Sequence, residues 1–208
     1  MIGAGGFGRE VLDVIEAMNA SSEEAIFRVL GVLDRDPSTL NAVRLAERGH
    51  RVIATPTAWL ANSSAADFVI GIGNPAVRAA LAQEFANAGH RPATLIHPAS
   101  TVGSRARIAE GVVICAGVQV SSNVIIGSHA HLNPNSIVGH DSELADFVSI
   151  NPGAIVSGDV RIGEQTLIGA GAVVLQGVSI GGRCTVGASA CVTRDVTPGS
   201  TVKGIPAR

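Results

Sequence analysis

An aliphatic side chain recurs at every sixth position from residue 96 onward, with no insertion. Seventeen successive positions hold only isoleucine, leucine or valine: Ile96, Val102, Ile108, Ile114, Val120, Ile126, Leu132, Val138, Leu144, Ile150, Val156, Ile162, Ile168, Val174, Ile180, Val186 and Val192. A helix has no six-residue period, and a flat sheet alternates every two residues. The pattern therefore predicts a chain that turns a corner every six residues and stacks coil on coil, which is a parallel β-solenoid.

A second inward position follows each aliphatic one by four residues. It holds a small side chain or a valine throughout: Ser100, Ala106, Val112, Val118, Val124, Ala130, Ser136, Ser142, Val148, Ala154, Val160, Thr166, Ala172, Val178, Cys184, Ala190 and Val196. Two of every six side chains thus point inward, and the aliphatic series itself implies no chemistry. We expect Cys184, at one of these positions, to be part of the core rather than a nucleophile.

Residues 96–197 resemble the hexapeptide-repeat acyltransferases, whose repeat is aliphatic, small, two variable, small, variable. The resemblance implies triangular coils of three hexapeptides and a left-handed wind. Residues 18 apart in sequence would then lie directly above one another, about 4.8 Å away.

Residues 1–95 have a different pattern, with helical periods and short apolar runs. Val11, Leu12, Ile15 and Met18 lie on one face of a helix predicted over 9–19. Strands are predicted over 27–33, 51–54 and 67–71, and a further helix near 76–88. This β–α–β order favours a small parallel sheet with helices on its faces. The expected fold is a Rossmann-like α/β half-domain over 1–95 that binds a nucleotide sugar, followed by a left-handed parallel β-helix over 96–208 that binds acetyl-CoA and carries the catalytic residues.

The N-terminal glycines Gly3, Gly5 and Gly8 form the pattern GxGxxG. Such a loop brings backbone amides and a helix N-terminus close to a phosphate. A domain of this size supplies one mononucleotide-binding half, so it suits a nucleotide with one short phosphate bridge better than a dinucleotide. Asp34, at the end of the second predicted strand, is a candidate acceptor for a ribose or base. Only two residues precede Gly3, so we expect several residues of the first strand to be missing, or else a poorly formed sheet edge.

Composition excludes several classes of function. The chain has 15 basic and 17 acidic side chains, and 14 of the basic ones are arginine, so no polycationic surface for nucleic acid is expected. No stretch approaches the roughly 18 apolar residues of a membrane span, and no signal peptide is evident, so we expect a cytoplasmic protein without membrane insertion. The three cysteines, Cys115, Cys184 and Cys191, show no CxxC spacing and indicate neither a disulfide framework nor a zinc knuckle.

Several motifs together identify a narrower family. They are the glycine-rich opening, Ile72-Gly73-Asn74, Leu95-Ile96-His97-Pro98, the ending Gly204–Ala207, and Asn133 seven residues before His140-Asp141. With these motifs the whole chain resembles the bacterial sialic-acid O-acetyltransferase and nucleotide-aminosugar N-acetyltransferase family. The resemblance implies acetyl-CoA as co-substrate without a metal, a nucleotide-linked amino sugar as acceptor, and a homotrimer with active sites between subunits. It also implies direct transfer without an acyl-enzyme, so all three cysteines would be dispensable.

In that family the histidine matching His140 is the general base that takes a proton from the acceptor as it attacks the thioester. Imidazole suits this role because it titrates near neutrality. The neighbouring Asp141 would favour the imidazolium, although the family often has the longer glutamate there. Asn133 is a candidate for orienting the ring, and Gly158, one coil above His140, is a candidate oxyanion donor. The alternative for His140 is an exposed turn histidine beside ordinary turn formers.

Binding residues follow partly from the same resemblance and partly from position and charge, as for Asp34, Lys203 and Arg208; terminal basic residues are also commonly just solvated. The predicted substrate-binding residues are Gly5, Gly6, Phe7, Asp34, Arg35, Gly73 and Asn74. The predicted acetyl-CoA-binding residues are Ser149, Ala170, Ala188 and Lys203, with Arg208 as a further candidate for the CoA phosphates. Many relatives have a second histidine at the position of Ser149. Either the serine makes that contact alone, or His131, 18 residues earlier, partly substitutes for it.

Other functions stay open at this point. The hexapeptide carbonic anhydrases bind a metal with three histidines, and His129, His131 and His140 invite the comparison. A nucleotide-binding domain is foreign to that class, and a His-x-His pair places its rings on opposite sides of a strand. A non-catalytic scaffold or sensor would explain the repeat but not the set around His140. Transfer to a hydroxyl, as in sialic acid, is an alternative to N-acetylation, and the sequence does not choose between UDP, dTDP and GDP. A role in surface glycan synthesis is inferred from the family.

Overall fold

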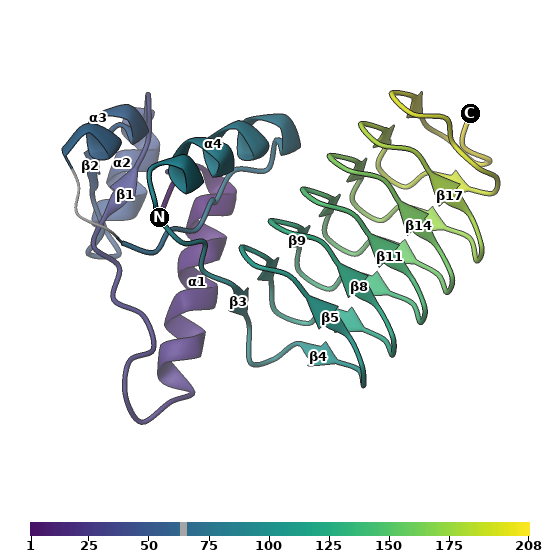
Figure 1. The fold of residues 1–208 in the computed structure, drawn as a ribbon, viewed down its shortest axis with the longest axis horizontal. Helices are drawn as coiled ribbons and strands as arrows, with labels where there is room; N and C mark the ends of the chain where they lie inside the picture. Colours follow the sequence, from purple (N-terminus) through teal and green to yellow (C-terminus); the bar gives the residue numbers. More distant parts are fainter. Residues whose placement is uncertain (63–65) are drawn as a thin grey trace.

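The computed structural model describes residues 1–62 and 66–208 as a small α/β domain followed by a β-helix (Figure 1). The elements of the first domain are α1 (Gly6–Ala20), β1 (Val32–Leu33), α2 (Thr39–Ala46), β2 (Val52–Ala54), α3 (Pro56–Asn62) and α4 (Pro75–Asn87). None of the helices in this part of the chain is long and apolar enough to cross a membrane.

The β-helix consists of two-residue strands that form three parallel sheets, here called faces one, two and three. Face one contains β3 (Leu95–Ile96), β6 (Val113–Ile114), β9 (His131–Leu132), β12 (Ser149–Ile150), β15 (Leu167–Ile168), β18 (Thr185–Val186) and β20 (Thr201–Val202). Face two contains β4 (Thr101–Val102), β7 (Gln119–Val120), β10 (Ile137–Val138), β13 (Ile155–Val156), β16 (Val173–Val174) and β19 (Cys191–Val192). Face three contains β5 (Arg107–Ile108), β8 (Ile125–Ile126), β11 (Glu143–Leu144), β14 (Arg161–Ile162) and β17 (Ser179–Ile180). This architecture confirms the predicted left-handed β-helix of hexapeptide repeats.

The strand register confirms the predicted coil length. Ile114 pairs with Leu132, and Ile150 with Ile168, so residues 18 apart are neighbours in the same sheet. The last coil departs from the repeat, because Ile180 pairs with Val196 and Thr185 with Thr201. The hexapeptide predicted after Val192 is therefore two residues shorter than the others.

All but two corners turn through a residue in the left-handed region of backbone conformation. At the corner between faces two and three, hereafter the two–three corner, the 18-residue series Arg105, Asn123, Asp141, Asp159 and Gly177 has φ between 56° and 74°. Asparagine, aspartate and glycine tolerate this conformation better than other residues. The requirement at the corner therefore selects short polar side chains, which then stand in a column along the outside of the solenoid.

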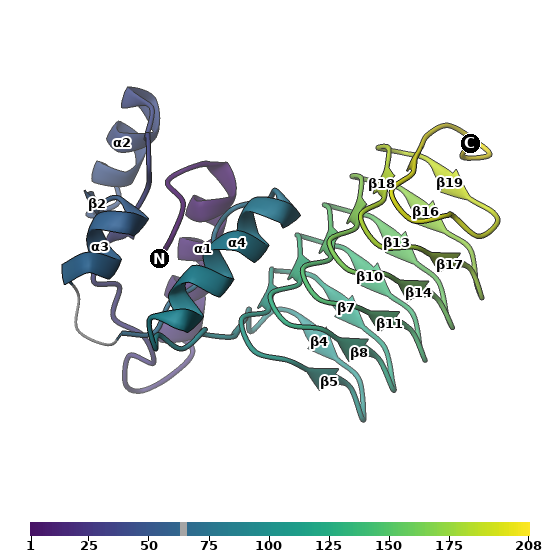
Figure 2. The same ribbon diagram turned by 45° about the horizontal axis from the view of Figure 1, so that its top comes forward.

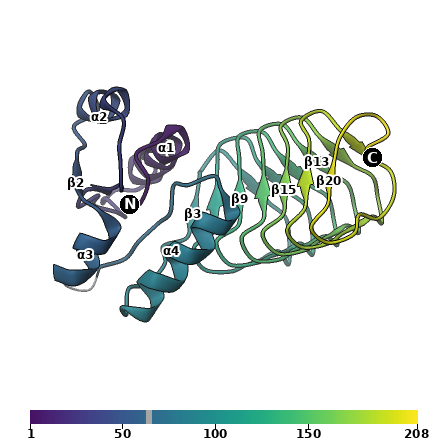
Figure 3. The ribbon, with the colours of Figure 1, turned by 90° about the horizontal axis from the view of Figure 1, so that it is seen from above.

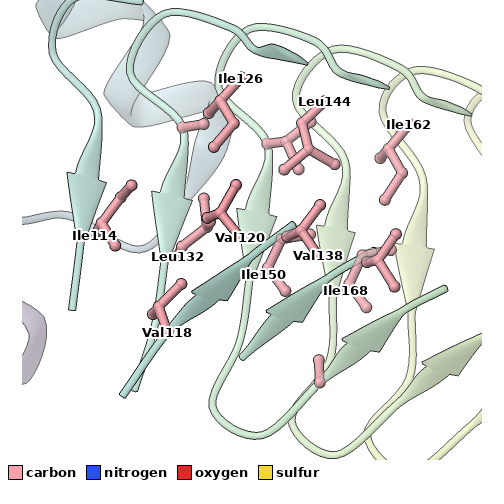
Figure 4. Packing of buried hydrophobic residues seen from close by; sticks show 14 of the residues in the cluster. Ile114, Val118, Val120, Ile126, Leu132, Val138, Leu144, Ile150, Ile162 and Ile168 are labelled. Atoms are coloured by element: carbon pink, nitrogen blue, oxygen red, sulfur yellow. The ribbon is translucent and has the colours of Figure 1, made fainter. Parts of the chain in front are cut away.

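The aliphatic positions form the core of the β-helix, as the repeat predicts (Figure 4). Ile114, Leu132, Ile150 and Ile168 are completely buried along face one. The first coil is less covered, since Val102 is 42% exposed. Burial of about 25 cal/mol per Å² of apolar surface makes this continuous column the main source of stability for the solenoid.

The N-terminal sheet is smaller than predicted. Its only paired strands in the described residues are β1 and β2, extended by bridges from Ile2 to Leu33 on one side and to Ile70 on the other. The strand predicted over 27–33 shrinks to Val32–Leu33, and the one predicted over 67–71 shrinks to isolated bridges at Phe68 and Ile70. The beginning of the chain lies in the middle of the sheet and not at its edge. Sequence reasoning also missed α2 and α3, whose first turns are capped by the Ser38 and Thr55 hydroxyls.

Helix α1 closes the open end of the β-helix (Figures 2 and 3). Its buried face, with Val11, Val14 and Ile15, belongs to the same hydrophobic cluster as Leu95 and the solenoid core. The predicted division at residues 95 and 96 falls within β3, the first strand of the solenoid. The two parts therefore share one continuous core, and the N-terminal domain is held in place on the first coils.

Candidate active site

His140 lies on the two–three corner directly after β10, and its side chain is 58% exposed. Its Nδ1 is 2.7 Å from Oδ2 of Asp141, so the aspartate reaches the ring despite being shorter than glutamate. Asn123, one coil below, donates its Nδ2 hydrogen to the other oxygen, Oδ1, at 2.8 Å. Asn123 and then His140 hold the pKa of Asp141 below its usual value. A charged Asp141 accepts the Nδ1 hydrogen of a neutral His140, which leaves Nε2 free to take a proton.

Asn123 is a residue that sequence reasoning missed. Its contact with Asp141 spans 18 residues, the same interval that links His140 to Gly158. The signal was present in the sequence, because the 18-residue interval that places Gly158 above His140 also places Asn123 below Asp141.

Gly158 lies directly against the His140 ring. A Cβ atom at this position would lie 2.6 Å from both Cε1 and Nε2 of the imidazole, so a side chain here would displace the ring. The structure gives the amide N–H of Gly158 no acceptor within residues 1–62 and 66–208. The corner thus places an unpaired hydrogen-bond donor next to the nitrogen that is free to act as a base.

Asn133 does not orient His140 within one chain. Its Nδ2 donates instead to the Ile150 carbonyl and to Oδ1 of Asn151, each at 3.1 Å. Seven residues exceed one six-residue side of the coil, so Asn133 falls on the corner between faces one and two, hereafter the one–two corner. The predicted contact is therefore wrong for residues of the same chain, and Asn123 gives His140 its support through Asp141.

Ala170 and Ala188 are exposed on the one–two corner, one coil apart. Lys203 is also exposed and continues this line, since a Cβ on Gly187 would lie 3.0 Å from the Cβ of Lys203. The structure thus brings three of the predicted acetyl-CoA residues together along one edge of face two. His140 and Gly158 occupy the opposite edge of the same face.

Ser149 lies apart from that line, on face one, and is 1% exposed. Its hydroxyl accepts a hydrogen bond from Nη2 of Arg78 at 2.9 Å and contacts the Gly73 carbonyl at 3.4 Å. In the single chain the serine is therefore turned toward the N-terminal domain, at the contact between the two parts of the protein.

His131 pairs with Ser149 in the register, as predicted, but it is also buried. Its ring packs on Phe7 with the centroids 4.5 Å apart, and neither ring nitrogen has a hydrogen-bond partner in the described residues. Burial, followed by the charges of Arg78 and His129, lowers the pKa of His131 well below its usual value, against a smaller opposing effect from the nearby Ile70 backbone. His131 is thus a neutral interface residue, covered by the N-terminal domain.

His129 lies in the same interface, stacked on Phe147 with centroids 5.3 Å apart. Burial lowers its pKa to about 4, with Arg78 contributing in the same direction. His129 and His131 are therefore covered, whereas His140 is exposed on a different corner. Within the residues that the structure describes, no three His, Cys, Asp or Glu side chains are grouped closely enough to share a metal ion.

The glycine-rich loop lies at the carboxyl end of the small sheet. Gly3 and Gly8 are required by packing, because a Cβ on Gly8 would lie 2.1 Å from the Gly3 carbonyl oxygen. No atom lies within 4 Å of a Cβ placed on Gly5 or Gly6, so the space above the first turn of α1 is open. This open helix N-terminus, without a side-chain cap, fits an anionic ligand.

The remaining predicted substrate residues surround this loop and the start of α4. Asp34 accepts from the backbone amides of Ala4 and Asp36, at 2.7 and 2.9 Å, so its carboxylate holds the loop in shape. Asn74 caps α4 by accepting from the amides of Ala76 and Val77. Arg35 and Gly73 are exposed. Among the described residues, no hydrogen bond or ion pair joins this group to His140.

A separate cavity lies on the other side of the small sheet. A space of about 370 Å³ opens at the amino ends of the small sheet, lined by apolar residues such as Ile15, Phe27 and Trp59. It is opposite the glycine loop and contains none of the predicted substrate residues. The geometry of the loops is a better guide to the ligand than this cavity, because phosphate sites form at helix N-termini and at the carboxyl ends of parallel strands.

Two of the three cysteines are not placed as nucleophiles, and the third, Cys191, is partly buried on β19. Cys115 and Cys184 are buried in the solenoid core. Burial raises the pKa of the Cys115 thiol to about 12, so it is protonated at neutral pH. A protonated, buried thiol is a poor acyl acceptor.

Two family models match the chain: the PglD N-terminal domain over residues 1–85, and the bacterial transferase hexapeptide (six repeats) over residues 159–194. Among curated proteins, GDP-perosamine N-acetyltransferase of Escherichia coli O157:H7 is 32% identical over 152 residues, which are 72% of this chain. The match spans 65% of the length of that relative.

Solved structures match over the full chain. The acetyltransferase domain of PglB from Neisseria gonorrhoeae is 34% identical with a TM-score of 0.85, and the match covers 100% of this chain and 96% of that domain. The same domain has been solved in complex with acetyl coenzyme A. PerB from Caulobacter crescentus, in complex with CoA and GDP-perosamine, is 29% identical with a TM-score of 0.82 over 100% of this chain and 94% of its own.

These matches include both the glycine-loop domain and the hexapeptide coils, and at 34% identity they cover nearly all of both chains. The chain therefore belongs to the bacterial sialic-acid O-acetyltransferase and nucleotide-aminosugar N-acetyltransferase family of hexapeptide-repeat acyltransferases.

Proposed function

We propose that this protein transfers the acetyl group of acetyl-CoA to the 4-amino group of a nucleotide-linked amino-dideoxysugar, with His140 as general base. The observation that carries the proposal is the chain of contacts from Asn123 through Asp141 to His140 on an exposed corner. The left-handed corner favours Asn123 and Asp141 on backbone grounds, and their contacts in addition hold a carboxylate against the His140 ring. The relatives support the acceptor, because PerB was solved with CoA and GDP-perosamine.

The reaction follows from the geometry at the two–three corner. Nε2 of His140 takes a proton from the sugar amine as the nitrogen attacks the thioester carbonyl. The carbonyl oxygen gains negative charge, and the N–H of Gly158 donates to it. The C–S bond then breaks, the proton on Nε2 passes to the CoA sulfur, and N-acetyl sugar and CoA are released. Asp141 stays charged throughout and stabilises the imidazolium between the two proton transfers.

The N-terminal domain binds the nucleotide part of the substrate. The open N-terminus of α1 at Gly5 and Gly6 receives the diphosphate, whose charge the helix dipole favours. Asp34, Arg35, Gly73 and Asn74 lie on the neighbouring loops, whereas Phe7 is in the first turn of α1 with its ring packed on His131. A metal is not required, because the backbone amides and the helix N-terminus supply the donors.

The active site forms between subunits of a homotrimer. His140 with Gly158 and the line of Ala170, Ala188 and Lys203 lie on opposite edges of face two, so a second copy has to bring its acetyl-CoA edge to the catalytic corner. The enzyme acts in the cytoplasm in surface glycan synthesis. The homotrimer, the cytoplasmic location and the role in surface glycan synthesis all extend the family resemblance to this chain.

Thiol release from acetyl-CoA tests the proposal, with a panel of UDP-, dTDP- and GDP-linked 4-amino-4,6-dideoxysugars and free sialic acid. We expect turnover on one nucleotide sugar and its loss in His140→Ala, while light scattering still reports a trimer. Turnover on sialic acid alone would mean that the acceptor is a hydroxyl and not an amine. No turnover on any acceptor, with acetyl-CoA still bound, would contradict the catalytic role and favour a binding protein.

A further inference from the structure

Arg78 on α4 is completely buried, which is unusual for a charged side chain. Within the described part of the chain it forms no ion pair with a carboxylate. Its hydrogen bonds run to backbone carbonyls and to one hydroxyl: Ile72 O at 2.9 Å, Gly73 O at 3.2 Å, His129 O at 2.9 Å, Phe147 O at 2.7 Å, Val148 O at 3.4 Å and Ser149 Oγ at 2.9 Å. Burial lowers the pKa of Arg78 to about 9.

The acceptors fall into two groups from different parts of the fold. Nη1 binds the carbonyls of Ile72 and Gly73, in the turn before α4. Nε and Nη2 bind His129 and Phe147, which occupy equivalent corner positions in successive coils of the β-helix. A single guanidinium therefore fastens the turn to two coils at once. Figure 3 shows α4 alongside the first coils, where this contact is made.

The two domains also have an apolar contact that does not involve this arginine. Val11, Val14 and Ile15 of α1 already bury an apolar face on the solenoid core. Burying a guanidinium without a carboxylate is costly, and apolar residues would hold the surfaces together at least as well. What the planar, five-donor fork adds is a fixed direction and distance for the groups that it binds.

The turn that Arg78 fixes is the one that carries Gly73 and Asn74. Both residues are exposed, no atom lies within 4 Å of a Cβ placed on Gly73, and the described residues offer no acceptor for either backbone N–H. We propose that Arg78 is a positioning residue, which sets the Ile72–Asn74 turn relative to the β-helix so that the nucleotide-linked sugar is presented at a constant place. This inference rests on the proposed function.

Arg78→Lys is the primary test, since lysine keeps the charge but cannot bind both groups with one planar fork. The matched control is Arg91→Lys, because Arg91 is 86% exposed and its one ion pair among the described residues is with Asp67. We expect Arg78→Lys to raise KM for the nucleotide sugar, and Kd for its nucleoside diphosphate by calorimetry, by on the order of 10- to 100-fold. KM for acetyl-CoA, and thiol release with the free amino sugar lacking a nucleotide, are expected to change less than about twofold, as in the control.

Ser149→Ala is the second variant, and it covers the case in which Arg78→Lys does not fold. It removes one acceptor of Arg78, so the inference predicts a smaller rise in KM for the nucleotide sugar. A rise only in KM for acetyl-CoA would instead support the cofactor role expected for Ser149 and overturn the inference.

Other outcomes separate this inference from the proposed function. If the wild type binds a nucleoside diphosphate but acetylates no sugar, the proposed function fails, and the Kd values of the variants still decide on Arg78. If Arg78→Lys lost activity equally with nucleotide-linked and free sugars, in parallel with a lower Tm, Arg78 would have only a structural role. A wild type that binds none of UDP, dTDP and GDP would overturn both proposals.

Discussion

Replacing Gly158 with alanine should disable catalysis without unfolding the protein. The new methyl group would lie 2.6 Å from Cε1 and Nε2 of His140, whereas two carbon atoms in ordinary contact are about 3.5 Å apart or more. The ring must therefore move by about 1 Å or rotate away. Movement is possible because the His140 side chain is 58% exposed. Gly158 is not among the residues with positive φ, so its backbone accepts alanine without strain.

The size of the effect follows from this displacement. A misplacement of about 1 Å at a reacting group costs on the order of 100-fold in rate. The oxyanion donor also becomes less accessible behind the methyl group, so kcat in the thiol-release assay should fall at least that far. The exposed ring can yield, so thermal unfolding should shift Tm by only about 2 °C or less, equivalent to a few tenths of a kcal/mol.

Gly182→Ala is the matched control. Gly182 holds the same place in another corner, and its Cβ would lie 3.2 Å from the Cγ and 3.3 Å from the backbone oxygen of Glu164, one coil below, which is a much milder contact than that at Gly158. We expect this variant to keep wild-type kcat and Tm. If Gly158→Ala also kept full kcat while a crystal structure showed the ring displaced, the assignment of His140 as the base would be refuted.

Three further predictions concern the site, the core and the domain contact. Asn123→Ala should lower kcat about tenfold, the equivalent of one charge-assisted hydrogen bond, and should raise the pKa of Asp141 in carboxyl NMR titrations; an unchanged pKa would contradict the role of Asn123. Leu132→Ala, in the middle of the core, should destabilise the protein by about 3 kcal/mol in denaturant unfolding, and a loss below about 1 kcal/mol would show that the stacked column is not the main source of stability. The pKa of His129 is lowered from 6.5 to about 4 in the folded state, so the unfolded chain takes up the proton at higher pH, and Tm should fall as pH decreases from 6.5 toward 4. In His129→Gln this fall in Tm should be smaller. If Tm fell equally with pH in both proteins, the effect would belong to other groups.

The solenoid could be predicted because its structural rule is local and repeats. Each aliphatic residue, such as Ile114 or Leu132, reports the same inward position, and seventeen repetitions leave no competing period. The short last coil breaks the rule only after Val192, where no further repeat exists to reveal it. The strands of the N-terminal domain were overestimated because strand length depends on the neighbour. Apolar runs such as 27–33 become strands only where another segment, here β2 and Ile2, pairs with them.

The candidate site shows the same division between local and non-local information. His140, Asp141 and Gly158 follow from a motif and from the coil length. Asn133 was misplaced because a spacing of seven residues suggests that it lies near His140. In the coil, however, Asn133 lies on the one–two corner and His140 on the two–three corner. Arg78 could not have been found, because one arginine within an ordinary helical pattern reads as a solvated residue. Only the packing of α4 against two coils buries it.

The arrangement of the solenoid also explains why catalysis would require a second chain. His140 and Gly158 stand on one edge of face two, and Ala170, Ala188 and Lys203 stand on the other. A parallel sheet with hydrogen bonds in every coil separates the two edges, and it cannot fold over to bring them together. A neighbouring copy can supply the missing edge if the contact is heterologous, with the acetyl-CoA edge of one copy against the catalytic edge of the next. A heterologous contact forms a closed ring only when its rotation divides a full turn, and in the proposed homotrimer each subunit would contribute to two active sites and a monomer would complete none.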